Sequence, residues 1–247
     1  MTTEFIVMLV LGAAAGGFIN GLAGTGTALF SLGFYLLVMP PITAIAISSV
    51  LAILGGFHGV WAVRNDIAGN SAKVLRFVLP GLLGVPIGVS LLDSVDADAL
   101  RVAIALLLIV YGGYFSFRSV LPSIERPAPV IDAVVSVVGG ILGGLASVSG
   151  AVPMMWLSMR PWSKGEIRAL LQPFNMVILA ATATLLLFKG AYDAVALNGL
   201  MIAIPVAMIA SLVGIYVFSR LSNAVFRRLL IALTLLTGTT ILVQMVT

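Results

Sequence analysis

Two glycine-rich interruptions of apolar sequence, one in each half of the chain, constrain the fold most strongly. The segments Gly16–Thr27 (GGFINGLAGTGT) and Gly139–Gly150 (GGILGGLASVSG) align so that Gly21 falls over Gly144, an offset of 123 residues in a chain of 247. Each copy opens with two glycines and places small and polar residues inside an otherwise apolar run. Duplicated, glycine-broken hydrophobic segments indicate the binding site of a membrane protein built from two repeats.

The composition places the chain in a lipid bilayer. Hydrophobic residues make up 61% of the chain and charged residues 9%, whereas soluble domains are typically about 25% charged. The chain has no cysteine, which excludes disulfides and thiolate chemistry. The basic residues that give the net charge of +4 lie in short loops. We therefore expect these loops to lie on the cytoplasmic side of a membrane, and we expect no nucleic-acid partner.

Eight apolar segments divide the chain into two similar halves. The first and fifth segments are unusually long and carry the glycine-rich interruptions. The expected organisation is a repeat over residues 1–122, a linker over 123–128 and a second repeat over 129–247. The segments run over about Phe5–Met39, Ile42–Val63, Val74–Leu92, Leu100–Phe117, Val130–Met159, Ile167–Phe188, Val195–Phe218 and Val225–Val246.

The distribution of loop charges predicts the topology. If all eight segments crossed the membrane, Lys and Arg would divide six against seven between the two sides. If the long segments, about 5–39 and 129–159, are hairpins that enter and leave on one side, eleven basic residues share a side and only Arg101 and Lys189 lie opposite. Such a bias is typical of membrane proteins. The sequence thus predicts an all-α polytopic protein of the cell inner (plasma) membrane, with two inverted repeats, each a glycine-broken re-entrant hairpin followed by three transmembrane helices, and with both termini outside.

The hairpin tips are the candidate substrate site. Irregular backbone at membrane depth is tolerated where it lines a cavity or is buried in protein, and the N-terminus of a half-helix favours an anion. The alternative is that these small residues only permit close helix packing; the amides and hydroxyls of the following segments likewise either bind substrate or join helices. The candidate residues are Asn20, Gly24, Thr25, Gly26, Thr27, Ser48, Ser49, Ser147, Ser149, Gly150, Gln172 and Asn175.

The paired motifs, here GGFINGLAGTGTALF and GGILGGLASVSGAVPMM, resemble those of the sulfite exporter TauE/SafE family of membrane proteins. The segments TAIAISS and IRALLQPFN and the loop Arg64–Asp66 are similar as well. The resemblance implies a secondary carrier of a small sulfur-containing anion, such as sulfite or an organosulfonate. The sequence has no Walker A signature, no HExxH motif and no His/Asp/Glu cluster, so we expect no cofactor and no metal. A homodimer is compatible with such a bundle.

Other functions remain open at this level. A channel-like facilitator, or a carrier of another small anion, would share the same hairpins. An intramembrane serine hydrolase using Ser147 or Ser149 with His58 is a remote third reading. His58 is either a neutral buried histidine or a proton relay. Arg168, just inside the sixth segment, is expected to snorkel to the interface or to draw anions toward the cytoplasmic mouth.

Overall fold

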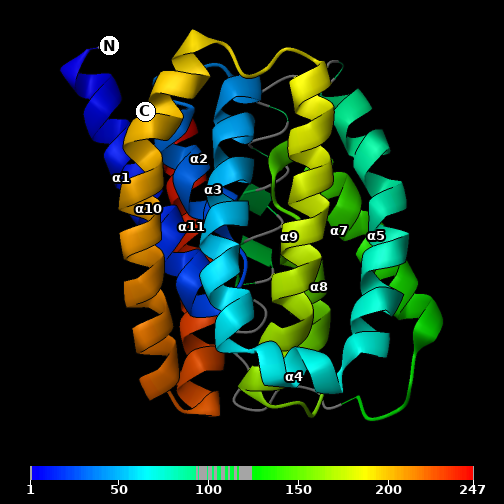
Figure 1. Ribbon diagram of the computed structural model, residues 1–247. Helices are drawn as coiled ribbons and strands as arrows, with labels where there is room; N and C mark the ends of the chain where they lie inside the picture. Colours follow the sequence, from blue (N-terminus) through cyan, green and yellow to red (C-terminus); the bar gives the residue numbers. More distant parts are fainter. Residues whose placement is uncertain are drawn as a thin grey trace.

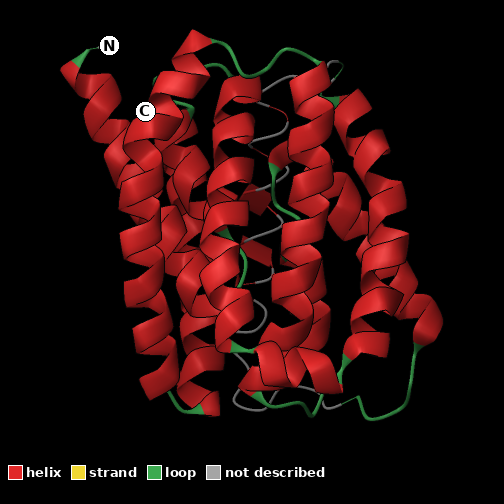
Figure 2. Cartoon of the chain, viewed as in Figure 1, coloured by secondary structure: helices red, strands yellow, loops and turns green. Residues whose placement is uncertain are grey.

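The chain folds into a bundle of helices. The computed structural model describes residues 2–92, 94 and 124–246, together with isolated positions between 99 and 116. Every regular element in those ranges is an α-helix (Figure 2), and six of them are long and apolar enough to cross a membrane. The prediction of an all-α polytopic membrane protein is therefore confirmed. The fourth predicted segment, about 100–117, lies largely outside the described residues, as do Arg101 and Arg118.

The first half contributes five described helices and the second half another five. They are α1 (Thr3–Ala23), α2 (Thr27–Tyr35), α3 (Pro41–Ala62), α4 (Arg64–Gly69), α5 (Ser71–Leu91), α7 (Pro129–Ala146), α8 (Ala151–Ser158), α9 (Lys164–Phe188), α10 (Ala194–Arg220) and α11 (Asn223–Val246). The helices that can span a membrane are α1, α3, α5, α7, α9 and α10. Each long predicted segment, the first and the fifth, is thus divided into two helices at its glycine-rich interruption.

The two interruptions end their helices in the same way. Gly24 after α1 and Ser147 after α7 are both left-handed, with φ of 81° and 55°, and they align in the duplicated segments. Their N–H groups donate to Asn20 O at 2.8 Å and to Gly143 O at 2.9 Å. A left-handed residue at this position terminates a helix and satisfies one of its last carbonyls.

After each interruption the chain folds back on itself. A Cβ placed on Gly16 of α1 would lie 2.7 Å from Thr27 O at the start of α2, and one on Gly12 would meet the ring of Tyr35 at its end. The same reversal occurs between α7 and α8, where a Cβ on Gly139 would lie 2.7 Å from Ser149 O. Both short helices therefore run antiparallel to the C-terminal part of the long helix that precedes them.

Glycine contacts also join the two halves of the chain. A Cβ on Gly21 of α1 would lie 2.0 Å from Ser211 O of α10, and a Cβ on Gly144 of α7 would lie 2.4 Å from Val85 O of α5. Gly21 and Gly144 align in the duplicated segments, so equivalent positions make equivalent contacts with the opposite half. Small residues at such crossings let two membrane helices approach closely.

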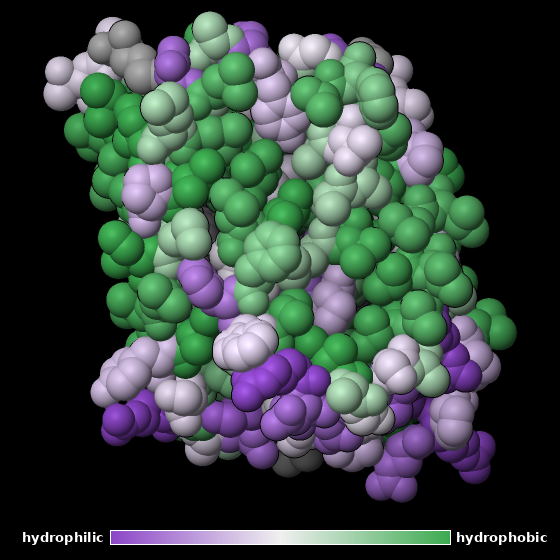
Figure 3. All heavy atoms as spheres, in the orientation of Figure 1, coloured by the Kyte–Doolittle hydropathy of each residue, from purple (hydrophilic) through white to green (hydrophobic). Residues whose placement is uncertain are grey.

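The loops rich in basic residues gather at one end of the bundle. Helix α4 lies across that end (Figure 1), where the Lys164 ammonium group donates to Leu221 O at 2.5 Å and Lys73 stacks 4.7 Å from the ring centroid of Trp162. The start of α1 and the end of α11 lie toward the other end (Figure 1). Between them runs a broad apolar band above a hydrophilic rim (Figure 3). Large apolar side chains such as those of Leu83 and Met201 are exposed. Such a band matches the hydrocarbon of a bilayer.

We expect Gly21→Ala and Gly144→Ala to destabilise the bundle by about 1–3 kcal/mol each, the usual cost of overpacking a close contact. The new methyl group would meet a backbone oxygen of α10 or α5, which cannot rotate away. The measurement is the thermal unfolding midpoint of the protein in detergent.

Gly69→Ala in α4 is the matched control, because no atom lies within 4 Å of its added Cβ. Unfolding midpoints of Gly21→Ala and Gly144→Ala equal to that of this control would contradict the proposed role of the close crossings.

Candidate functional site

The two turns that interrupt the helices lie against each other. A Cβ on Gly150 would be 1.8 Å from the hydroxyl oxygen of Thr25, so the glycine permits the contact between the turns. Asn175 of α9 joins them: its Oδ1 accepts hydrogen bonds from Thr25 Oγ1 at 3.3 Å and from Ser149 Oγ at 2.5 Å. All four residues are buried. The structure thus brings together candidates from both halves that are 150 residues apart in sequence.

A second polar contact links the later turn to α3. The hydroxyl oxygens of Ser147 and Ser49 lie within hydrogen-bond distance of each other and of Ile45 O, which is 3.1 Å and 2.9 Å away. Because each hydroxyl has one proton, one serine donates to the other and the second donates to Ile45 O. Because Ser147 has a positive φ, which is uncommon outside glycine, these bonds help to hold a backbone conformation that its side chain does not favour. Ser147 therefore both ends α7 and contributes a polar group to the candidate site.

Three further candidates contact the first hairpin or α3 rather than the opposite turn. Ser48 shares a hydrogen bond of 2.9 Å with Ser31 of α2, and the amide group of Asn20 donates to Ala52 O at 2.9 Å. Thr27 is buried, and within the described ranges its hydroxyl has no hydrogen-bond partner. Asn20 and Ser48 therefore hold α1 and α2 against α3, while Thr27 keeps a donor free at the first turn of α2.

Gln172 lies beside the first turn. A Cβ on Gly24 would be 2.9 Å from its Oε1, and one on Gly59 of α3 would be 2.2 Å from the same atom. Gln172 is completely buried, yet neither of its side-chain polar atoms finds a hydrogen-bond partner among the described residues. A buried polar group without a partner costs roughly 1–3 kcal/mol, so this amide indicates a function other than stability.

Arg168 lies one helical turn before Gln172 on α9, and its position contradicts one expectation. The interpretation that it snorkels to the interface is wrong, because its side chain is fully buried. Its guanidinium lies 4.3 Å from the ring centroid of Phe218 and donates from Nη1 to Leu22 O at 3.5 Å. Its Nε and Nη2 have no hydrogen-bond partner in the described part of the chain. The signal was present in the sequence, since Arg168, Gln172 and Asn175 recur at i, i+4 and i+7 and so share a helix face.

The free groups around the turns are mainly hydrogen-bond donors. Asn175 Nδ2, Gln172 Nε2 and two nitrogens of Arg168 are buried and unpartnered across the described ranges. Helices α2 and α8 start at Gly26 and Gly150 without a side-chain cap, so the N–H groups of their first turns have no capping acceptor. This excess of donors, with the positive ends of two short helices, is suited to an anion.

His58 lies apart from the serines that the hydrolase reading needs. It is partly exposed on α3, and its Nδ1 has no hydrogen-bond partner among the residues described. Ser149 donates to Asn175, while Ser147 bonds to Ser49 and Ile45. The serine–histidine pair of a hydrolase is not formed, and a proton-relay role for His58 stays a prediction.

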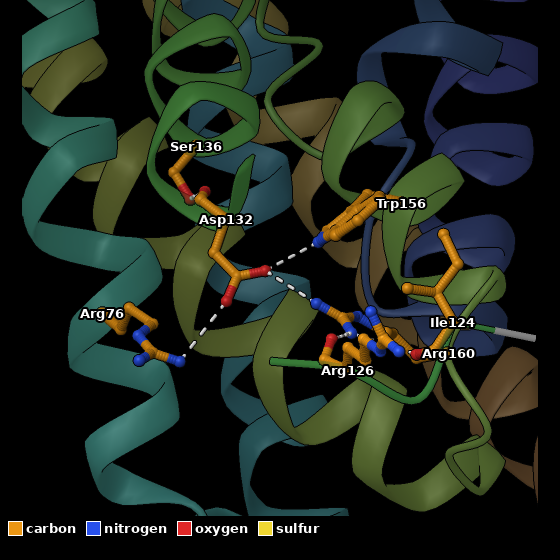
Figure 4. A network of polar contacts seen from close by, with 7 residues as sticks. All are labelled: Arg76, Ile124, Arg126, Asp132, Ser136, Trp156 and Arg160. Carbon is orange, nitrogen blue, oxygen red and sulfur yellow. Dashed lines mark hydrogen bonds and ion pairs between the residues drawn. The ribbon is translucent and has the colours of Figure 1, made fainter. Parts of the chain in front are cut away.

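One buried carboxylate, Asp132, anchors the second hairpin away from the turns. Its Oδ1 accepts from Trp156 Nε1 at 2.7 Å and from Arg160 at 3.4 Å, and its Oδ2 pairs with Arg76 at 3.5 Å (Figure 4). Arg160 also donates to the carbonyls of Ile124 and Arg126, at 3.0 Å and 2.6 Å. The network ties the start of α7 to the end of α8, to α5 and to the linker, as Figure 4 shows. No local pattern in the sequence singles out Asp132, because its partners lie 24 to 56 residues away along the chain.

A family model described as sulfite exporter TauE/SafE matches residues 8–241. The chain belongs to this family. It is also similar to the probable sulfite/organosulfonate exporter TauE of Cupriavidus necator, with 25% identity over 204 residues that cover 81% of this chain and 79% of the relative. The resemblance stated from the motifs is confirmed, and a TauE/SafE chain with several apolar, membrane-spanning helices is a membrane transporter.

We expect Asp132→Asn to destabilise this TauE/SafE protein by about 3–5 kcal/mol, because the change removes the buried negative charge that pairs with the guanidinium of Arg160. The asparagine would still accept a hydrogen bond from Trp156, so the change tests the charge. The measurement is the thermal unfolding midpoint in detergent.

Glu125→Gln is the control, because it removes an exposed carboxylate from the neighbouring linker. Equal midpoints for Asp132→Asn and Glu125→Gln would show that the buried ion pair contributes no net stability.

Proposed function

We propose that this chain is a secondary carrier of a small sulfur-containing anion, such as sulfite or an organosulfonate, and that the anion binds between the two helix turns. The observation that carries the proposal is the set of buried, unpartnered donors on α9 beside the point where the turns meet. Family membership and the named activity of the Cupriavidus relative support the choice of anion.

The proposed architecture is a pair of inverted repeats, each with one re-entrant hairpin. Three matched features support it: the aligned left-handed residues Gly24 and Ser147, the antiparallel pairs α1–α2 and α7–α8, and the equivalent contacts of Gly21 and Gly144 with the opposite half. In the view of Figure 1 the first hairpin starts from the end opposite α4, and the second from the end near α4. Two hairpins from opposite faces would meet near the middle of a bilayer.

In the proposed orientation the protein lies in the inner membrane of the cell, and its α4 end faces the cytoplasm. The basic loops gather at that end, and positive residues favour the cytoplasmic side. Both termini would then lie outside.

The proposed mechanism is alternating access around the meeting point of the turns. N–H groups at the first turns of α2 and α8 would bind the anion's oxygens, with the free Nδ2 of Asn175 as a further donor. The hydroxyls of Thr25 and Ser149 would turn from Asn175 Oδ1 to the anion. Rocking of one half against the other would expose this site to each side in turn. The direct contact between Thr25 and Gly150 describes a conformation in which the turns are closed on each other.

The test is uptake into proteoliposomes of radiolabelled isethionate, with sulfite as a competitor. We expect uptake that saturates with concentration, and we expect Asn175→Leu to lower it at least about tenfold because the variant removes a hydrogen-bonding group of the site. Thr184→Val on the same helix is the control, since Thr184 is exposed.

Uptake that rises linearly with concentration would contradict the proposed carrier and would indicate a channel-like facilitator. No uptake of any sulfur anion by folded protein would overturn the proposed substrate class.

A further inference from the structure

Arg168 is a fully buried cation whose charge is not balanced within the described protein. No described carboxylate lies within ion-pair distance of its guanidinium, whose protein contacts are the ring of Phe218 and the carbonyl of Leu22. An unpaired charge in a membrane interior is costly and marks a functional position. The ring and one carbonyl at 3.5 Å offset only part of that cost.

The aliphatic stem of Arg168 and the amide of Gln172 adjoin the first turn. A Cβ on Gly24 would lie 3.2 Å from Arg168 Cγ and 2.9 Å from Gln172 Oε1, so both side chains pack against the αL glycine that ends α1. The free donors are Nε and Nη2 of Arg168 and Nε2 of Gln172. Adjacent guanidinium donors match two oxygens of one oxyanion, and an amide one helical turn away can supply a third hydrogen bond.

The charge around this position sets the charge of the ligand. Asp132 is the one buried carboxylate in the described ranges, and it is already engaged with Arg160, Arg76 and Trp156. The polar groups at the meeting of the turns, on Thr25, Ser149 and Asn175, are neutral. One cation, two helical turns before Asn175 on α9, therefore accompanies polar groups that are otherwise neutral.

We propose that Arg168 and Gln172 form the charge-bearing part of the substrate site and select a singly charged oxyanion, namely an organosulfonate or hydrogen sulfite, over doubly charged anions. The inference rests on the proposed function, which it deepens. The sulfur-bound oxygens pair with the Arg168 guanidinium and the Gln172 amide, while Thr25, Ser149 and Asn175 contact the organic part of an organosulfonate. A second negative charge would remain uncompensated in a site of low dielectric.

The first experiment measures the shift of the thermal unfolding midpoint that isethionate causes in detergent. Sulfate, a doubly charged anion, is tested separately at the same ionic strength. We expect stabilisation by isethionate but not by sulfate, and an affinity at least about 30-fold weaker in Arg168→Gln, as when one partner of a buried charge pair is truncated. Arg220→Gln, which removes an exposed basic residue at the end of α10, should bind isethionate as the parent does.

The second variant, Gln172→Glu, places a carboxylate one turn from Arg168, where it can pair with the guanidinium. We expect a higher midpoint without ligand, because the cation gains a partner, and loss of the isethionate-dependent shift. This variant keeps the test decisive if Arg168→Gln fails to fold.

The outcomes separate the two proposals. If the parent protein binds or transports isethionate and both Arg168→Gln and Gln172→Glu retain its affinity, Arg168 is structural and this inference is overturned while the carrier remains. Equal stabilisation of the parent by sulfate and isethionate would overturn the selection for one charge. If folded parent protein neither binds nor transports any sulfur anion, the proposed function itself fails.

Discussion

The need to satisfy backbone polar groups away from water governs the arrangement of this bundle. A helix that ends inside the hydrocarbon leaves carbonyl and N–H groups without partners, which no lipid can supply. The turns at Gly24 and Ser147 meet part of this requirement through their own αL bonds, and both turns are buried in protein. The bonds from Ser147 to Ile45 O and from Thr25 to Asn175 show that α3 and α9 provide the cover. The other helices follow from the need to enclose these two turns.

Glycines make that enclosure possible and also shape the site. On α3, Gly56 and Gly59 face α9, and a Cβ on either would lie 3.2 Å or less from a side-chain atom of Gln172. A larger residue on α3 would therefore occupy the position of the amide. Close packing by these small residues is compatible with the proposed ligand binding, because the packing of glycine against α9 leaves room for a polar side chain between the helices.

Much of this arrangement could be predicted from the sequence, because it depends on local signals. The glycine in the αL conformation and the uncapped starts of the short helices lie within a few residues of each glycine-rich interruption, and the lengths of the apolar segments can be counted along the chain. The twelve candidate site residues are all buried. The environment of Arg168 could not be predicted in this way. Its depth was judged from its nearness to a segment end, whereas its burial depends on Phe218 of α10 and on Leu22, which is 146 residues away. The partners of Asp132 are similarly distant in sequence.

A duplicated scaffold does not require duplicated chemistry. Equivalent positions hold the backbone geometry, as Gly24 and Ser147 do, but at the same offset of 123 residues Arg168 corresponds to Ile45, which is buried and apolar. If the halves are inverted repeats, as proposed, the scaffold is nearly symmetric across the membrane while the single cation belongs to one half. Motion of the halves would then change which side reaches the site, whereas the charge on α9 would continue to determine what binds there. The geometry common to both repeats would thus serve movement, and the residues that differ between them would serve selection.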